Sequence, residues 1–160
     1  MNVILQILFI LVLGGLCFQD FKERKISLSL LILGILLGGG IHFTQKNGAG
    51  FLTEIAINTF IVFMLFLILA MYAKLKMKQP IFNVFGLGDL LFFMLLAVSF
   101  PFLSFLIIFV FSLLFSWSIF MLTKRHLKIK TVPLAGLQSL FLLLILITNK
   151  VTNSLDLFAM

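Results

Sequence analysis

Residues 101–122, PFLSFLIIFVFSLLFSWSIFML, form an apolar run that contains no charged side chain. A helix needs about 20 apolar residues to cross the hydrocarbon core of a bilayer. Backbone polar groups cannot be left unpaired in lipid, so such a run must form a helix or a strand of a closed barrel. The run is long and shows no alternation of apolar and polar residues, which predicts a membrane-spanning helix.

Five more apolar segments occur on either side of this run, at about residues 2–18, 27–43, 53–73, 82–99 and 133–149. Their lengths lie within or close to the range of about 17–25 residues that spanning helices use. Pro101 predicts a tight turn between the fourth and fifth helices, because proline begins a helix more readily than it continues one. The sequence therefore predicts an all-α integral membrane protein, with six transmembrane helices in a single polytopic domain over residues 1–160.

The composition agrees with a membrane protein. Of the 160 residues, 62% are hydrophobic and 11% are charged, whereas soluble domains contain about 45–50% apolar and about 25% charged residues. The net charge of +7 does not indicate a nucleic-acid partner, because the basic residues lie in the short gaps between apolar segments, where membrane topology places them. With one cysteine and two distant histidines, we expect no metal site and no other cofactor.

The distribution of basic residues predicts the orientation of the helices. Ten lysines and arginines fall in the gaps after the first, third and fifth helices, whereas only Lys46 and Lys150 fall in the gaps on the other side. Lysine and arginine are enriched in cytoplasmic loops, so the side with ten is expected to face the cytoplasm. Both termini are then expected on the extracytoplasmic side.

The five acidic residues differ in their expected surroundings. Glu54 and Asp156 lie near extracytoplasmic helix ends and are interpreted as solvated. Glu23 lies among lysines and is interpreted as a surface ion-pair partner. Asp20 lies at the cytoplasmic end of the first helix and Asp89 just inside the fourth, so the topology places these two at the same face and at similar depth.

An ionisable residue in a transmembrane segment is a candidate functional residue, and Asp20 is the expected partner of Asp89. Two carboxylates that lie close together cannot both ionise easily and therefore share a proton. The ionised member can deprotonate a water while the protonated member polarises a peptide carbonyl. This is hydrolysis of a peptide bond without a metal or a nucleophilic side chain. Gly86 and Gly88 allow backbone or substrate to approach closely, and can adopt strained dihedrals beside the acid.

Structural interpretations of both acids stay open at this point. Asp89 can cap the N-terminus of the fourth helix, where a carboxylate is favoured. Asp20 can pair with Arg24 or Lys22 and fix the end of the first helix. In the second helix the spacing of Gly34 and Gly38 predicts close packing of helices, without a chemical role.

Three short motifs resemble those of the type IV prepilin peptidase family, which are GxGD membrane aspartic proteases. GLGD, residues 86–89, is similar to the GxGD signature of this family. DFKERKI, residues 20–26, resembles the block that contains the first aspartate, and KTVPLAG, residues 130–136, resembles a block at the start of the last helix. The three motifs occur in the family's order, so the resemblance extends over essentially the whole chain.

The resemblance implies an aspartic endopeptidase of the inner (cytoplasmic) membrane, a hydrolase with its active site near the cytoplasmic face. Members of the family remove the short basic leader of prepilin-like proteins of type IV pilus systems, just before the hydrophobic pilin helix. The implied partners are such a substrate and membrane lipids. By resemblance, Asp20 and Asp89 are the catalytic pair. The residues that shape the loops around the substrate are then Gly86, Gly88, Arg24 and Pro133.

The chain also departs from the family pattern. Ser27 and Leu28 follow Ile26 where the family often has Ile-Pro-Asn, and Leu91 stands where members commonly have a lysine. The chain resembles the short single-domain members, which lack the cysteine-rich insertion of the longer bifunctional enzymes. These departures leave open a catalytically inactive homologue that serves as a membrane assembly subunit and needs neither aspartate.

A small proton-linked carrier is a third hypothesis, and it would depend on Asp89 alone. Carriers typically bind their substrate near the bilayer midplane, between repeats of inverted topology. We find no inverted repeat in the sequence, and both acids are expected at one face. These two features favour the peptidase over the carrier.

Overall fold

The computed structural model describes residues 3–23, 26–46, 48–78, 86–123, 134–152 and 157. Within these ranges the chain forms six α-helices and no strand. The helices are α1 (Val3–Glu23), α2 (Leu28–Gln45), α3 (Gly48–Tyr72), α5 (Leu87–Ser99), α6 (Phe102–Thr123) and α7 (Leu134–Thr152), and a π-helical turn, η1 (Ala73–Met77), continues α3. The prediction of six helices is confirmed, and each observed helix overlaps one of the apolar runs.

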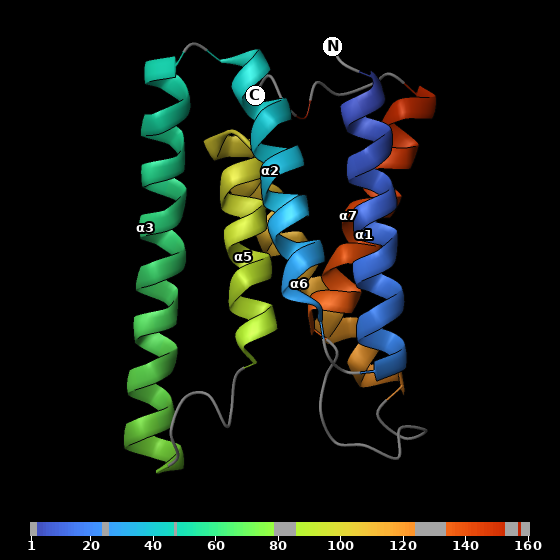
Figure 1. Cartoon of the computed structure of the whole chain (residues 1–160). Helices are drawn as coiled ribbons and strands as arrows, with labels where there is room; N and C mark the ends of the chain where they lie inside the picture. The colour runs from blue at the N-terminus through green and yellow to red at the C-terminus, as the bar shows by residue number, and fades with distance from the viewer. Residues whose placement is uncertain are drawn as a thin grey trace.

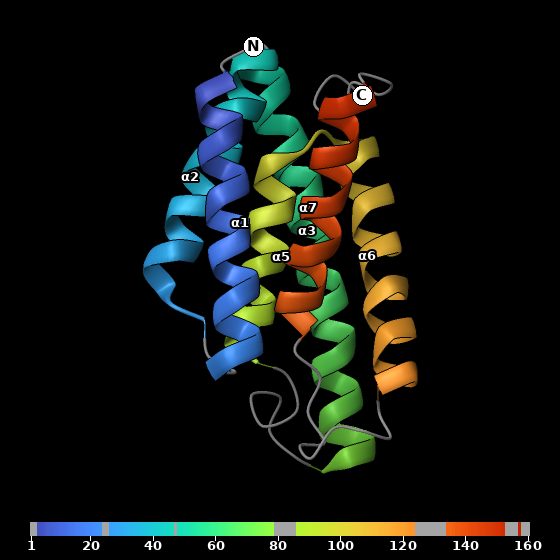
Figure 2. The ribbon, with the colours of Figure 1, turned by 90° about the vertical axis from the view of Figure 1, so that its right-hand side faces the viewer.

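Successive helices run in opposite directions and form one bundle (Figures 1 and 2). The start of α1 and the end of α7 lie at the same end of this bundle, which agrees with the expectation that the termini share a side (Figure 1). The end of α1 and the starts of α5 and α7 lie at the opposite end. Which end faces the cytoplasm stays a prediction.

The surface of the bundle is that of a membrane protein. Ile4, Leu75 and Leu122 expose 74%, 73% and 78% of their surface, and exposed apolar area is unfavourable in water by about 25 cal/mol per Å². Four helices, α1, α2, α3 with its continuation, and α6, are long and apolar enough to cross a bilayer. The segments Leu87–Ser99 and Leu134–Lys150 are shorter apolar helices. The spanning of the membrane by all six therefore stays a prediction.

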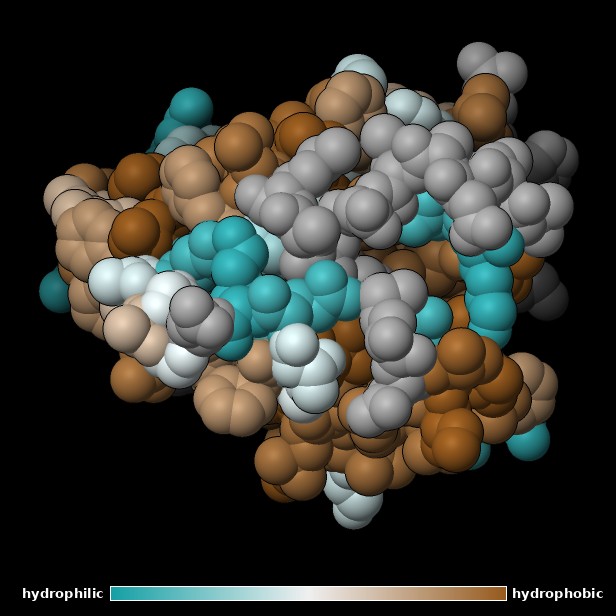
Figure 3. Space-filling view, turned by 90° about the horizontal axis from the view of Figure 1, so that it is seen from above, coloured by the Kyte–Doolittle hydropathy of each residue, from teal (hydrophilic) through white to brown (hydrophobic). Residues whose placement is uncertain are grey.

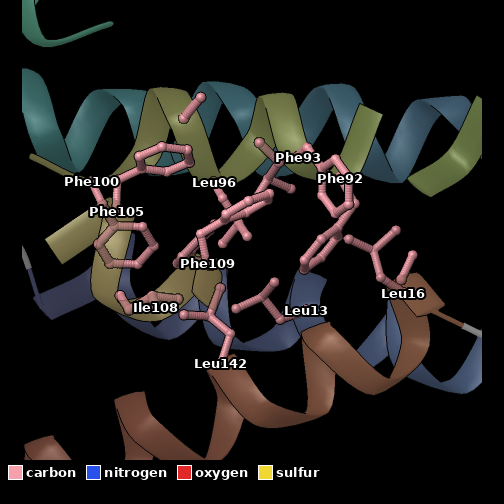
Figure 4. Packing of buried hydrophobic residues seen from close by; sticks show 14 of the residues in the cluster. Leu13, Leu16, Phe92, Phe93, Leu96, Phe100, Phe105, Ile108, Phe109 and Leu142 are labelled. Carbon is pink, nitrogen blue, oxygen red and sulfur yellow. The ribbon is translucent and has the colours of Figure 1, made fainter. Parts of the chain in front are cut away.

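A core of aromatic and aliphatic side chains lies between α1, α5, α6 and α7 (Figure 4). Phe93 meets Phe109 edge to face with 4.9 Å between ring centroids, and Phe105 stacks on Phe109 at 5.4 Å. Such aromatic pairs stabilise a core beyond the apolar area that they bury. The core joins the helices that carry the two candidate aspartates to α7.

Glycines allow α2 to pack directly on α5. A Cβ at Gly34 would lie 2.6 Å from Cδ1 of Leu95, and a Cβ at Gly38 would collide with the side chain of Ser99. The prediction of close helix packing through small residues is confirmed. The tight turn before α6 is also confirmed, because Pro101 is not helical and its carbonyl accepts the first hydrogen bond of the helix, from Phe105 at 2.8 Å.

The interpretation of Glu54 as a solvated helix end is wrong. Its Oε2 lies 2.9 Å from Nε2 of the fully buried His42, and its Oε1 accepts a hydrogen bond from Lys46 at 3.0 Å. The other ring nitrogen of His42 lies 3.0 Å from the carbonyl oxygen of Val98, near the end of α5. Glu54 therefore belongs to a polar cluster that joins α2, α3 and α5. Seen from this end, hydrophilic side chains occupy the middle of the bundle and apolar ones surround them (Figure 3).

Asn58 extends this contact between α3 and α5. It is fully buried, and its Nδ2 donates to the carbonyls of Ala97 and Phe100, both at 3.0 Å. The last carbonyls of a helix have no partner within the helix. Asn58 and His42 therefore satisfy the carbonyl end of α5, far from its aspartate.

Candidate active site

Asp20 lies at the end of a buried stripe on α1. The stripe contains Phe9, Leu13, Leu16 and Asp20, which are spaced three or four residues apart and so lie on one face of the helix. Asp20 exposes 7% of its surface, although a charged side chain is rarely buried without a partner. Its Oδ2 accepts a hydrogen bond from the backbone amide of Gly136 at 2.6 Å.

Asp89 lies in the first turn of α5, three residues after Gly86, the residue that caps this helix. Its carboxylate accepts a hydrogen bond from the amide of Gly86, which is the reciprocal contact of a capping box. The interpretation of Asp89 as a helix cap is therefore correct in part. Its Oδ1 also accepts a hydrogen bond from the amide of Ala135 at 3.0 Å, so the same carboxylate is bound to α7 as well.

The two aspartates thus bind consecutive amides, those of Ala135 and Gly136, in the first turn of α7. Amides at a helix N-terminus have no carbonyl partner within the helix, and the helix dipole favours negative charge there. The carboxylates are close enough for their charges to interact. The start of α7, which lies in the third motif, therefore holds side by side the aspartates of the first and second motifs.

Gly136 permits this approach for a steric reason. A Cβ at this position would lie 2.7 Å from Oδ2 and 2.9 Å from Cβ of Asp20. No rotation of the Asp20 carboxylate could relieve the second contact, because Cβ is fixed to the backbone of α1. Any larger residue at position 136 would therefore push α7 away from α1.

Gly86 and Gly88 lie beside Asp89, as expected. A Cβ at Gly86 would lie 3.3 Å from Oδ2 of Asp89, and a Cβ at Gly88 would lie 3.3 Å from Cδ1 of Ile26. Gly86 has φ −72° and ψ 140°, which any residue can adopt. Close approach, and not a strained backbone, therefore accounts for the glycine at position 86.

Of the other residues that the sequence singled out, two lie outside the described ranges and two have structural roles. Arg24 and Pro133 lie outside the described residues. Ser27 occupies the N-cap position of α2 without a side-chain capping hydrogen bond, and its amide donates to Oε1 of Gln19, the residue before Asp20, at 3.2 Å. Leu91 is half-buried and packs against the hydrophobic core, so an apolar residue suits its position.

No side chain in the sequence marks Ala135 and Gly136 as site residues. They act through backbone amides, which leave no side-chain signature, although both lie in the quoted KTVPLAG motif. Cys17 is a further neighbour of the site that the sequence does not indicate. It precedes Asp20 by one helical turn, and its thiol is hydrogen-bonded to the side chain of Ser139 on α7.

The described residues offer acid–base chemistry at this end of the bundle. They contain no group of three or more His, Cys, Asp or Glu side chains that could hold a metal ion. What they present is a pair of carboxylates with backbone amides that fix their orientation. One carboxylate as base and one carboxyl as acid is the minimum that hydrolysis by general acid–base catalysis requires.

Comparison with protein-family models gives a match to the type IV leader peptidase family over residues 7–122. The chain belongs to the type IV leader peptidase family. The resemblance drawn from the three motifs is thereby confirmed, and at the level of the family it implies an aspartic-type peptidase. The match to the type IV leader peptidases contains Asp20 and Asp89 but ends before α7. Searches of curated proteins and of solved structures give no significant match.

Proposed function

We propose that this member of the type IV leader peptidase family is an active aspartic endopeptidase. It removes the short basic leader of prepilin-like substrates at the cytoplasmic boundary of the cytoplasmic membrane. The observation that carries the proposal is the binding of Asp20 and Asp89 to consecutive amides of α7, at 2.6 and 3.0 Å. Family membership supports the same reaction class.

The pair performs the reaction with one proton shared between its members. The ionised aspartate takes a proton from a water, and the water oxygen attacks the carbonyl carbon of the scissile peptide bond. The protonated aspartate donates its proton to the carbonyl oxygen, which gives a tetrahedral intermediate. The C–N bond then breaks as the first aspartate returns its proton to the leaving nitrogen, while the second aspartate takes back a proton from a hydroxyl of the intermediate, which becomes the carboxylic acid. Atoms and protons balance without a further reactant.

The amides of α7 contribute by holding both carboxylates in one orientation. Preorganised groups lower the barrier because they need not rearrange as charge develops. In this protein the orientation of both acids depends on the same helix turn, Ala135–Gly136. Movement of α7 would therefore affect both acids together.

The proposal is tested by cleavage of a co-expressed prepilin-like protein in membranes. Wild type is compared with Asp20→Asn and Asp89→Asn, which keep the shape of the side chain and remove its acid–base function. Glu23→Gln is the matched control, because Glu23 is an exposed acid on the same helix as Asp20. We expect wild type and Glu23→Gln to shorten the substrate, and the two aspartate variants to leave it intact.

Two results would contradict the proposal. Cleavage by both aspartate variants at the wild-type rate would show that the aspartates are structural. Failure of the wild type to cut any prepilin-like protein of its own genome would identify an inactive homologue, in agreement with the departures at Ser27 and Leu91.

A further inference from the structure

Gln138 is a polar residue in an apolar part of α7. Its side chain is fully buried, and leucines occupy the positions before and after it at 134, 137, 140 and 142. Within the described ranges, neither Nε2 nor Oε1 of Gln138 has a hydrogen-bond partner. Burying an amide in this way is unfavourable, and most buried polar groups in proteins are paired. This residue therefore requires an explanation.

Four buried serines of the bundle are satisfied by their own helix. The hydroxyls of Ser99, Ser112, Ser116 and Ser139 each donate to a carbonyl three or four residues earlier. Among the residues that the structure describes, Asn58 Oδ1 and Ser104 Oγ also have no partner. They belong to the opposite end of the bundle, where Nδ2 of Asn58 is bound twice. Gln138 differs because both polar atoms of its amide are unpaired and because it follows the site residues Ala135 and Gly136 on α7.

Gln138 follows the two residues of α7 whose amides bind the aspartates, Ala135 and Gly136, by three and two positions. Helical side chains lean toward the N-terminus of their helix and cover the residue three or four positions earlier. For Gln138 these residues are Leu134 and Ala135, and the amide of Ala135 binds Asp89. Gln138 therefore lies one helical turn after the amide that binds Asp89, and its buried side chain faces the interior of the bundle.

We propose that Gln138 binds the main chain of the peptide substrate next to the scissile bond, on the side that lies deeper in the membrane. A peptide group has one N–H donor and one carbonyl acceptor, and a primary amide can complement both. In apolar surroundings the substrate backbone has no water to pair with, so this contact satisfies both molecules. The inference rests on the proposed peptidase function and adds a substrate-binding residue to it.

The proposal makes two coupled predictions for Gln138→Leu. Leucine has a similar size and no polar atom, so the variant should be more stable without substrate, with Tm higher by about 2–4 °C. It should also bind substrate less well, with kcat/KM lower by about tenfold and most of the loss in KM. Thr148→Val is the matched control, because it removes a hydroxyl that donates to the nearby carbonyls of Leu144 and Ile145, near the opposite end of the same helix.

The measurement is a thermal melt of the purified protein in detergent together with cleavage kinetics on a prepilin-like peptide. An unchanged KM in Gln138→Leu would overturn the proposal. A lower Tm would also overturn it, because it would show that Gln138 is satisfied within its own chain. A loss confined to kcat would overturn it in favour of a role in positioning the aspartates or the water.

Failure of the proposed peptidase function can be separated from failure of this inference. Binding of a labelled prepilin-like peptide is measured in an Asp20→Asn background, with and without Gln138→Leu. Weaker binding in the double variant supports the inference even if the wild type cuts nothing. Equal binding in both would overturn it even if the wild type is an active peptidase.

Discussion

Gly136 donates its backbone amide to Asp20 across 2.6 Å, although the two residues are 116 positions apart in the sequence. The preceding amide, that of Ala135, binds Asp89. One turn of α7 therefore joins α1 to α5 at the place where both candidate acids lie. The site depends on α7, which lies beyond the residues of the family match.

Gly136→Ala should reduce both activity and stability. The new Cβ would lie 2.9 Å from Cβ of Asp20, so α7 must move, and overpacking of this kind costs about 1–3 kcal/mol. We expect kcat/KM to fall by about a hundredfold or more, because both carboxylates lose their amide partners. Cleavage kinetics and a thermal melt measure the two effects.

Gly40→Ala is the control for this substitution. Gly40 is also a helical glycine, and no atom lies within 4 Å of a Cβ built there. Alanine in a helix is more favourable than glycine by about 0.5–1 kcal/mol, so this variant should be slightly more stable and fully active. Equal behaviour of the two variants would argue against the contact between Gly136 and Asp20.

Gly88→Ala should be tolerated despite the place of Gly88 in the GLGD motif. The nearest atom to the new Cβ is Cδ1 of Ile26 at 3.3 Å, the flexible end of a side chain that can move by a few tenths of an ångström. We expect a loss of stability of about 1 kcal/mol or less and cleavage close to wild type. Loss of cleavage in a variant that melts normally would indicate that substrate occupies the space beside Gly88.

Asn58→Leu should lower the stability of the bundle and leave the catalytic reaction unchanged. The substitution leaves the carbonyls of Ala97 and Phe100 without the amide that now binds both. A buried acceptor without a partner costs about 1–3 kcal/mol, so Tm should fall by several degrees. The kcat/KM of the folded fraction at low temperature should stay unchanged. A selective loss of activity would link the polar end of the bundle to catalysis.

Cys17 offers a chemical test of access to the site. It is the single cysteine of the chain and lies one helical turn from Asp20, hydrogen-bonded to Ser139. Alkylation by a small maleimide should abolish cleavage, because the added group would separate α1 from α7. Cys17→Ala should cleave normally and resist the reagent. If the same reagent also inactivated Cys17→Ala, the loss of cleavage would come from modification of another residue and not of Cys17.

Much of the fold follows from the sequence for simple physical reasons. Apolar runs of bilayer length predict helices, and Pro101 predicts the turn between two of them. The same-face placement of Asp20 and Asp89 followed from the distribution of lysines and arginines alone. The structure places both at the end of the bundle where α1 ends and α5 begins, which agrees with that placement.

Contacts between helices that are distant in the sequence could not be predicted from apolar runs and charge distribution. Glu54 was interpreted as solvated because its partners, His42 and Lys46, belong to another helix whose position the sequence does not specify. The contacts of Ala135 and Gly136 are made by backbone amides, which every residue except proline possesses. Gln138 could not be predicted as unpaired, because the sequence of an apolar run does not reveal whether a single glutamine in it has a hydrogen-bond partner.

The joint action of Asp20 and Asp89 is tested most directly by a double-variant experiment. The quantity is kcat/KM on a prepilin-like peptide for Asp20→Asn, Asp89→Asn and the double variant, each purified and shown to melt like the wild type. Residues that act as one catalytic group lose function together and not additively. We predict a loss of about a thousandfold or more in each single variant and no further loss in the double variant. Losses that multiply, or a single variant with near wild-type activity, would contradict catalysis by the pair.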